Sequence, residues 1–169
     1  FLKKGISVVG IEPSCILTFR DEIPSIMRDK KSDLLRKYSF TFEELLEKKL
    51  SKVKFMPSQK KVLLHGHCHQ KAFDAMKPIL KILKAIPKIN FEVIDTSCCG
   101  MAGAFGYNKS TYDISIKMAN DKLIPFIKKQ KEDVIIIADG TSCRTQIKDG
   151  SNRSAMHFSR FLENLIIKE

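Results

Sequence analysis

The sequence lacks an apolar run of the roughly 18 residues that a membrane-spanning helix needs, so we expect no transmembrane segment. It also lacks a start Met, and its first residues, Phe1-Leu2-Lys3-Lys4, do not lead into a signal peptide. We interpret this start as a cut within a longer protein. Hydrophobic residues make up 43% of the 169 residues, which excludes a mainly disordered chain and supplies ample material for one core.

The net charge of +11 raises the question of an acidic partner, which could be nucleic acid, anionic lipid or an acidic redox protein. The chain has no dense Arg/Lys stripe with interleaved aromatic residues and no nucleic-acid-binding motif. We therefore expect no binding to nucleic acid. Most lysines lie at solvent-facing positions of amphipathic segments, and docking of an acidic partner or peripheral association with a membrane stays an alternative.

The sequence contains no C-x-x-C pair, although it has five cysteines. Two of them, Cys98 and Cys99, are adjacent, and adjacent cysteines rarely bond to each other. The odd number and the spacing do not fit a disulfide framework. We therefore expect a reducing compartment, with metal or redox chemistry at the cysteines and a cytoplasmic location.

The chain alternates predicted strands and helices. Apolar runs predict strands at residues 6–11, 61–65, 90–95 and 133–139. Amphipathic segments predict helices at residues 19–37, 39–46, 66–85, 111–129 and 157–167. Thr41 and Glu44 have the spacing of a capping box, and Pro78 is expected to kink or split its helix. This order predicts an α/β fold with a mostly parallel sheet and flanking helices.

Every cysteine follows a predicted strand, so all five could converge on the rim of the sheet where ligands bind. Residues 7–15 and 135–143 also resemble each other, because both read as an apolar strand that continues through an acidic residue to Ser-Cys. We therefore predict two repeats. Residues 1–60 are the C-terminal tail of an upstream repeat plus a helical connector, and residues 61–169 are a complete repeat.

Four potential metal ligands stand within five positions in His65-Gly66-His67-Cys68-His69, and Cys98, Cys99 and Cys143 follow. Thiolates are soft ligands that suit zinc and iron–sulfur clusters. Structural zinc sites usually use short C-x₂₋₄-C knuckles, whereas ligands from several loops suit an iron–sulfur cluster. Zinc stays an alternative. Gly100 is expected to let the backbone come close to a bulky cluster.

Three blocks resemble the cysteine-rich CCG domain: Gly66-His67-Cys68-His69-Gln70, Cys98-Cys99-Gly100-Met101-Ala102-Gly103 and Gly140-Thr141-Ser142-Cys143. That domain occurs in iron–sulfur subunits of glycolate oxidase, anaerobic glycerol-3-phosphate dehydrogenase and heterodisulfide reductase. The block Gly10 to Glu22 looks most like a fused form, in which an FAD-linked oxidase domain, a ferredoxin-like 4Fe–4S domain and two CCG repeats share one chain. Those proteins oxidise D-2-hydroxy acids such as D-lactate, glycolate or D-2-hydroxyglutarate.

The resemblance implies that Cys68, Cys98, Cys99 and Cys143 bind the cofactor. In heterodisulfide reductase a noncubane 4Fe–4S cluster has a fifth cysteine, whose position falls here on Gly140, so an ordinary four-cysteine cluster, a site with an added histidine, or zinc stays open. The further candidates for metal binding are His67, His69 and Cys15. We expect His65 to be structural and His157 to cap the last helix.

The resemblance also implies a role in a larger enzyme. The chain is expected to be the C-terminal iron–sulfur region of an FAD-linked oxidoreductase, passing electrons from flavin toward a quinone or carrier. Its partners would be upstream FAD and ferredoxin-like domains or subunits, at the inner face of the membrane or in the cytoplasm. No catalytic set stands out in the fragment itself. The alternatives are a cluster-based disulfide reductase module and a zinc-binding docking module.

Overall fold

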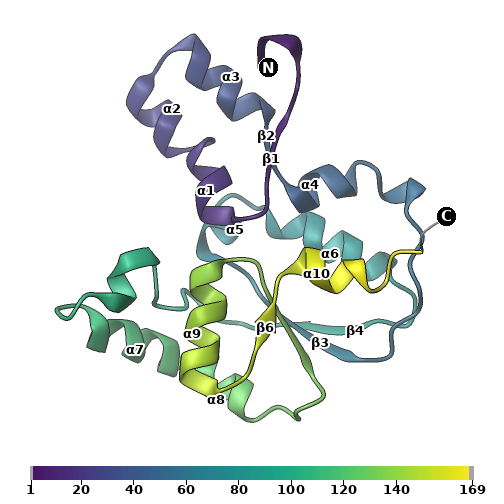
Figure 1. The fold of residues 1–169 in the computed structure, drawn as a ribbon, viewed down its shortest axis with the longest axis vertical. Helices are drawn as coiled ribbons and strands as arrows, with labels where there is room; N and C mark the ends of the chain where they lie inside the picture. The colour runs from purple at the N-terminus through teal and green to yellow at the C-terminus, as the bar shows by residue number, and fades with distance from the viewer. Residues whose placement is uncertain (1, 168–169) are drawn as a thin grey trace. The chain divides into compact units, whose positions relative to one another are not determined.

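The computed structural model describes residues 2–167 and divides into two compact units. The first unit joins the residues up to Val53 with His69–Ile82, and the second joins Lys54–Cys68 with the residues from Leu83 onward. Both contain parallel strands flanked by helices, so the predicted α/β class is confirmed (Figure 1).

The first unit is built on a two-stranded parallel sheet of β1 (Val8–Gly10) and β2 (Ser39–Thr41). Its helices are α1 (Pro13–Thr18), α2 (Glu22–Met27), α3 (Lys30–Tyr38), α4 (Phe42–Glu47) and most of α5 (Cys68–Ala72) and α6 (Met76–Ala85). Short 3₁₀ turns form at Leu2–Lys4 and Leu50–Lys52. In α6 the buried Ile79 and Ile82 belong to this unit, whereas Leu83 belongs to the second.

The predicted helix at residues 19–37 is two helices in the structure. Arg28 adopts a left-handed conformation, with φ of 49°, and ends α2. Asp29 then starts α3 with a capping box, in which its side chain accepts a hydrogen bond from the Ser32 amide at 2.7 Å. The expectation that residues 39–46 form one helix is wrong, since Ser39–Thr41 pairs with β1 as a strand. The capping box of Thr41 and Glu44 is confirmed at the start of α4.

The second unit contains a four-stranded, all-parallel sheet in the order β4-β3-β5-β6. Its strands are β3 (Lys61–His65), β4 (Asn90–Val93), β5 (Ile135–Ala138) and β6 (Ala155–Met156). Its helices are α7 (Tyr112–Asp121), α8 (Leu123–Lys128), α9 (Thr141–Ser151) and α10 (Phe158–Glu163), with a 3₁₀ turn at Gly103–Tyr107. The long apolar run at residues 133–139 gives the buried strand that the sequence predicts.

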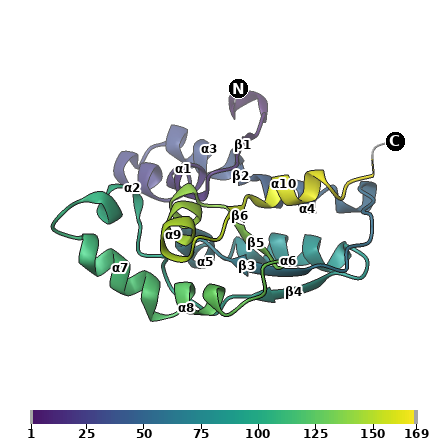
Figure 2. The same cartoon turned by 60° about the horizontal axis from the view of Figure 1, so that its bottom comes forward.

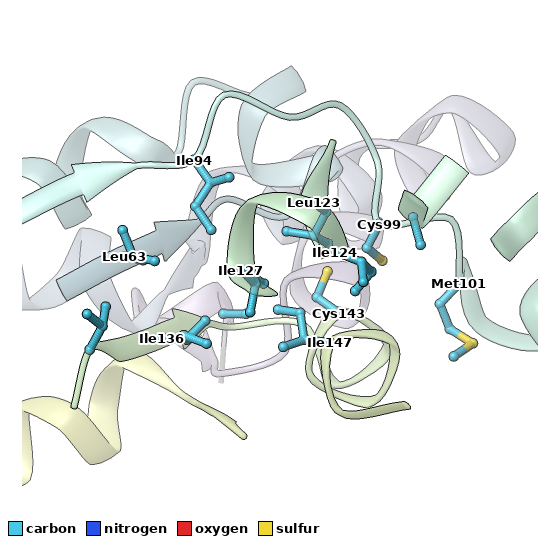
Figure 3. Close-up of a cluster of buried hydrophobic side chains, with 13 residues drawn as sticks. Leu63, Ile94, Cys99, Met101, Leu123, Ile124, Ile127, Ile136, Cys143 and Ile147 are labelled. Carbon is cyan, nitrogen blue, oxygen red and sulfur yellow. The ribbon is translucent and has the colours of Figure 1, made fainter. Parts of the chain in front are cut away.

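Helices cover both faces of this sheet, and α8 and α10 lie on opposite sides of it (Figures 1 and 2). Successive side chains of a strand point to opposite faces, so Leu63 and Ile136 face one layer. They join a buried cluster with Ile124 and Ile127 of α8 and Ile147 of α9 (Figure 3). This core fixes α8 and α9 against the strands whose ends carry the cysteines.

Prolines divide two of the predicted helices. A proline lacks the amide hydrogen and its ring clashes with the carbonyl four residues earlier, so Pro125 separates α7 from α8. The predicted single helix at residues 111–129 is therefore wrong. The split expected at Pro78 is confirmed, because α5 ends at Ala72 and α6 begins at Met76. Within residues 2–167, no helix combines the length and the apolar character needed to cross a membrane.

Candidate metal centre

The carboxyl ends of three neighbouring strands carry the four cysteines of the second unit. Since β3, β4 and β5 are parallel, their ends lie at one edge of the sheet. The chain leaves β3 for β4 on one side and returns as β5 on the other, and such a reversal of strand order opens the crevice where α/β proteins bind ligands. Cys68 follows β3, Cys98 and Cys99 follow β4, and Cys143 follows β5.

The structure brings Cys68, Cys98, Cys99 and Cys143 together as one four-cysteine cluster. Cys98 interacts by hydrogen bonding with Cys68 and Cys99, and Cys99 interacts in the same way with Cys143. Cys68 is exposed, Cys98 is half-buried, and the last two are buried. The four-cysteine cluster therefore runs from the surface into the core, where Figure 3 shows Cys99 and Cys143 among the buried side chains of Ile124 and Ile147. All five cysteines lie within the described residues, and each is a reduced cysteine outside any disulfide.

Hydrogen bonding divides the cluster into thiols and thiolates. Contact with Cys68, and then with Cys99, lowers the pKa of Cys98 far below that of an ordinary cysteine. Contact with Cys99 likewise lowers the pKa of Cys143, which His65 and His67 lower further, whereas the pKa of Cys99 is raised. Cys143 also lies in the first turn of α9, where the helix dipole favours a negative charge. Thiolates are the form in which cysteines bind metals.

His65, the last residue of β3, lies beside the deepest part of the cluster. One of its ring nitrogens and the Sγ atoms of Cys99 and Cys143 all lie within 4.8 Å of one another. Its Nδ1 is 3.1 Å from Thr96 Oγ1. Sequence reasoning gave His65 a structural role because it lies within a strand. Its position at the very end of a predicted strand, on the edge of the sheet where ligands were expected, could have indicated His65 as a candidate from the sequence.

His67 is buried at the same edge and lies against Gly140. A Cβ atom on Gly140 would stand 2.5 Å from His67 Cδ2 and 3.2 Å from Cys143 Sγ. The imidazole of His67 therefore occupies the space that a side chain at position 140 would need. The backbone at this position has no room for a fifth cysteine unless His67 moves.

Gly100 shapes the loop that carries the adjacent cysteine pair. Its φ is +88°, and an added Cβ would lie 2.4 Å from the carbonyl oxygen of Ser115 in α7. Its amide donates to Cys98 Sγ at 3.3 Å. We expected Gly100 to let the backbone approach a cluster, and the close approach that the structure shows is instead to α7. The following loop is tied to α9 where the Gly103 amide donates to Ser142 Oγ at 3.3 Å.

The other predicted ligands belong to the first unit. Cys15 is exposed on α1. His69 lies 3.9 Å from a carboxylate oxygen of Glu22 and packs on the ring of Phe73 at a centroid distance of 5.3 Å. The expected cap is confirmed at His157, whose Nδ1 accepts a hydrogen bond from the Ser159 amide at 3.0 Å.

Residues 62–148, which include the whole four-cysteine cluster, match the family model of the CCG cysteine-rich domain. This chain belongs to the CCG family. The CCG domain begins in β3 and ends in α9, so it covers the three strands whose ends carry the four-cysteine cluster.

Curated relatives extend the match over most of the chain. The chain is 29% identical over 158 residues to a subunit of the anaerobic glycerol-3-phosphate dehydrogenase of Escherichia coli, an alignment of 91% of this chain and 39% of that protein. It is 28% identical over 160 residues to the D-2-hydroxyglutarate dehydrogenase of Haemophilus influenzae, covering 86% of this chain and 15% of that protein. The D-2-hydroxyglutarate dehydrogenase of Pantoea ananatis is 25% identical, over 97% of this chain and 16% of that protein. No solved structure matches the chain.

Proposed function

We propose that this CCG domain binds an iron–sulfur cluster through Cys68, Cys98, Cys99 and Cys143 and transfers electrons within a multidomain dehydrogenase. The observation that carries the proposal is the continuous contact among the four sulfurs at the crevice of the parallel sheet. Four thiolates are the ligand set of an ordinary 4Fe–4S cluster. When bound, such a cluster supplies one-electron redox chemistry.

The surroundings of the cysteines support a redox cluster. Met101 and Cys99 both belong to the buried hydrophobic cluster, and Cys143 is only 2% exposed. Exclusion of water and hydrogen bonds to sulfur are two of the means by which proteins set cluster potentials. The Gly100 amide, which donates to Cys98 Sγ, supplies one such bond. Short zinc knuckles are absent from the sequence, which favours iron over zinc.

The relatives and the sequence resemblance together suggest the parent enzyme. The chain spans 39% or less of the relatives described above, so their substrates and partners are proposals here. We propose a D-2-hydroxy acid as substrate, since residues 10–22 look like the fused FAD-linked form. Flavin in a separate domain would accept the electrons of the substrate, and this CCG domain would relay them toward a quinone or carrier.

The first unit supports the proposed repeat. Its strand β1 pairs in parallel with β2 and leads into α1, which carries Cys15, just as β5 pairs with β6 and leads into α9 with Cys143. In both places the second strand is followed by an N-capped helix, α4 or α10. We therefore propose that residues 1–60 are the tail of an upstream CCG repeat with its connector, and that residues 61–169 form the complete one.

The test is reconstitution of the full chain with ferrous iron and sulfide in the absence of oxygen, followed by iron, zinc and acid-labile sulfide analysis and a visible spectrum. We expect bound iron with an equal amount of sulfide and a broad absorption in the brown region. The double variant Cys98→Ser/Cys99→Ser is expected to lose both.

Zinc bound in stoichiometric amount without sulfide would overturn the proposal in favour of a docking module. A cluster that reduces an added disulfide directly would point to disulfide reductase chemistry. Failure of the wild-type chain to retain either metal would also contradict the proposal. The variant Cys15→Ser serves as the control, because Cys15 lies in the first unit and its loss is expected to leave the iron content unchanged.

A further inference from the structure

We infer that His65 is a further ligand of the cluster, binding iron through Nε2 beside Cys99 and Cys143. A nitrogen ligand added to the four thiolates would distinguish this cluster from an ordinary four-cysteine one. This inference rests on the proposed function, because it needs iron at the four-cysteine cluster. It does not follow from the resemblance, which carries only cysteines onto this chain and assigns nothing to His65.

The two ring nitrogens of His65 have different surroundings. Nδ1 is 3.1 Å from Thr96 Oγ1, a hydroxyl that can accept its hydrogen. Nε2 is buried, and within the described residues no hydrogen bond of normal geometry reaches it, although His65 also interacts with the Cys143 thiolate. The residue is 1% exposed, so water does not satisfy this atom from outside. A buried polar atom without a partner costs free energy and calls for an explanation, such as a bound ion.

The position of this nitrogen gives the explanation. A ring nitrogen of His65 and the Sγ atoms of Cys99 and Cys143 lie within 4.8 Å of one another, so a metal centre held by the two thiolates would lie within reach of the imidazole. With the proton on Nδ1 and donated to Thr96, Nε2 keeps its lone pair for the metal. A second hydrogen bond that fixes the tautomer and the ring orientation is the usual support of a histidine ligand.

Gly140 and His67 are the other residues at this edge of the site. A side chain at position 140 would collide with His67, so this position contributes no ligand. His67 itself packs against Gly140 and belongs to the interactions of the site. The unpartnered buried nitrogen is that of His65, so His67 serves as the matched control.

A neutral imidazole would add no charge to the cluster and its ligands. A thiolate in its place would make them more negative by one unit, so the reduced form would be harder to reach. Histidine in place of cysteine raises the reduction potential of other iron–sulfur centres in the same direction. We therefore expect His65→Cys, in which the ligand is a thiolate, to lower the midpoint potential.

The experiment uses the full chain labelled with ¹⁵N-histidine and loaded anaerobically with ferrous iron and sulfide. Pulsed EPR of the paramagnetic redox state measures whether a histidine nitrogen is coupled to the cluster. We expect a strong coupling in the wild type and in His67→Gln, and its loss in His65→Gln. Thr96→Val, which removes only the partner of Nδ1, is expected to weaken or alter the coupling while the cluster remains.

The outcomes separate this inference from the proposed function. A wild-type cluster with no coupled histidine nitrogen overturns the role of His65 and leaves the four-cysteine cluster intact. Coupling that survives in His65→Gln and disappears in His67→Gln assigns the ligand to His67 and also overturns the inference. Absence of any iron–sulfur cluster in the wild type refutes the proposed function itself. If His65→Gln does not fold, the wild-type spectrum and Thr96→Val still decide.

Discussion

The segment from β5 to α10 and the segment from β1 to α4 have the same order of elements and the same pairing. Val8 and Val9 pair with Ser39 and Phe40, and Ile136 and Ile137 pair with Ala155 and Met156. In both segments the last strand residue stands five positions before a cysteine of the next helix. The equivalence of the two segments is therefore structural as well as sequential.

The two segments differ at the other edge of their first strand. β5 pairs there with β3, which ends in His65 and leads to Cys68. Within the part of the chain that the structure describes, β1 pairs with β2 alone. Its surroundings are apolar and open, with Val9 and Ile11 exposed beside a hollow of about 680 Å³. A Ser-Cys turn after a strand thus joins a cluster of potential metal ligands where neighbouring parallel strands bring further cysteines to the same edge.

The largest expected difference between the two segments concerns their equivalent cysteines, Cys15 and Cys143. We expect Cys143→Ser to lose most of the iron and sulfide of the reconstituted chain, because it removes a ligand in the buried part of the cluster. We expect Cys15→Ser to retain both. Iron and sulfide analysis after gel filtration measures the difference, and circular dichroism shows whether each variant is folded.

Equal losses of iron in Cys143→Ser and Cys15→Ser would refute the distinction between the two segments. Such a result would mean that Cys15 also binds the cluster.

A second contrast concerns how the reactivity of Cys98 changes with pH. The segment from β1 to α4 contains no cysteine at an equivalent place. In the reduced, metal-free chain the lowered pKa keeps Cys98 a thiolate, so its alkylation rate should be nearly constant between pH 6 and 8. An ordinary thiol with a pKa near 8.5 gains roughly seventyfold more thiolate over this range. Iodoacetamide labelling followed by peptide mass spectrometry measures the rate, with a cysteine peptide as reference.

The variant Cys68→Ala tests the cause of the lowered pKa. Contact with Cys68 is the largest influence on Cys98, so its loss should restore a rate that rises with pH. An unchanged profile in this variant would contradict the assignment.

Gly100 offers a contrast in stability within the metal-binding loop. We expect Gly100→Ala to lower the free energy of unfolding by about 3 kcal/mol, because the φ of +88° and the contact with Ser115 both oppose a side chain. Gly103→Ala is the matched control, since Gly103 also has a positive φ but nothing within 4 Å of its added Cβ. It should cost about 1 kcal/mol. Urea unfolding that gave equal losses would argue against the close approach of the loop to α7.

Sequence patterns predicted the parts of the fold that local physics determines. The apolar run of β5 and the caps at Thr41 and His157 have direct signatures, and all are present. The strands β2 and β6 were not predicted, because three and two residues are too few for a period to show. They become strands only through pairing with β1 and β5, which the local sequence does not encode.

The candidate site likewise contains residues that the sequence could indicate and residues that it could not. The cysteines could be singled out because thiols at strand ends carry a chemical signal of their own. The direction of a histidine side chain depends on which strand lies beside it, so His65 and His69 could not be ranked from their spacing. In the structure His65 lies beside Cys99 and Cys143, whereas His69 contacts Glu22 and Phe73 of the first unit.

The smallest expected effect concerns the stability that the capping box at Thr41 gives to the first segment. Thr41 Oγ1 accepts from the Glu44 amide at 3.3 Å, and a Glu44 carboxylate oxygen accepts from the Thr41 amide at 2.9 Å. Thr41→Ala should therefore lower the free energy of unfolding by about 1 kcal/mol, and Thr41→Ser, which keeps the hydroxyl, should cost less. Because Thr41 belongs to the first unit, the iron content of the reconstituted chain should not change. Loss of iron in Thr41→Ala would show that metal binding also depends on the first segment, and would contradict the view that the two segments are independent in this respect.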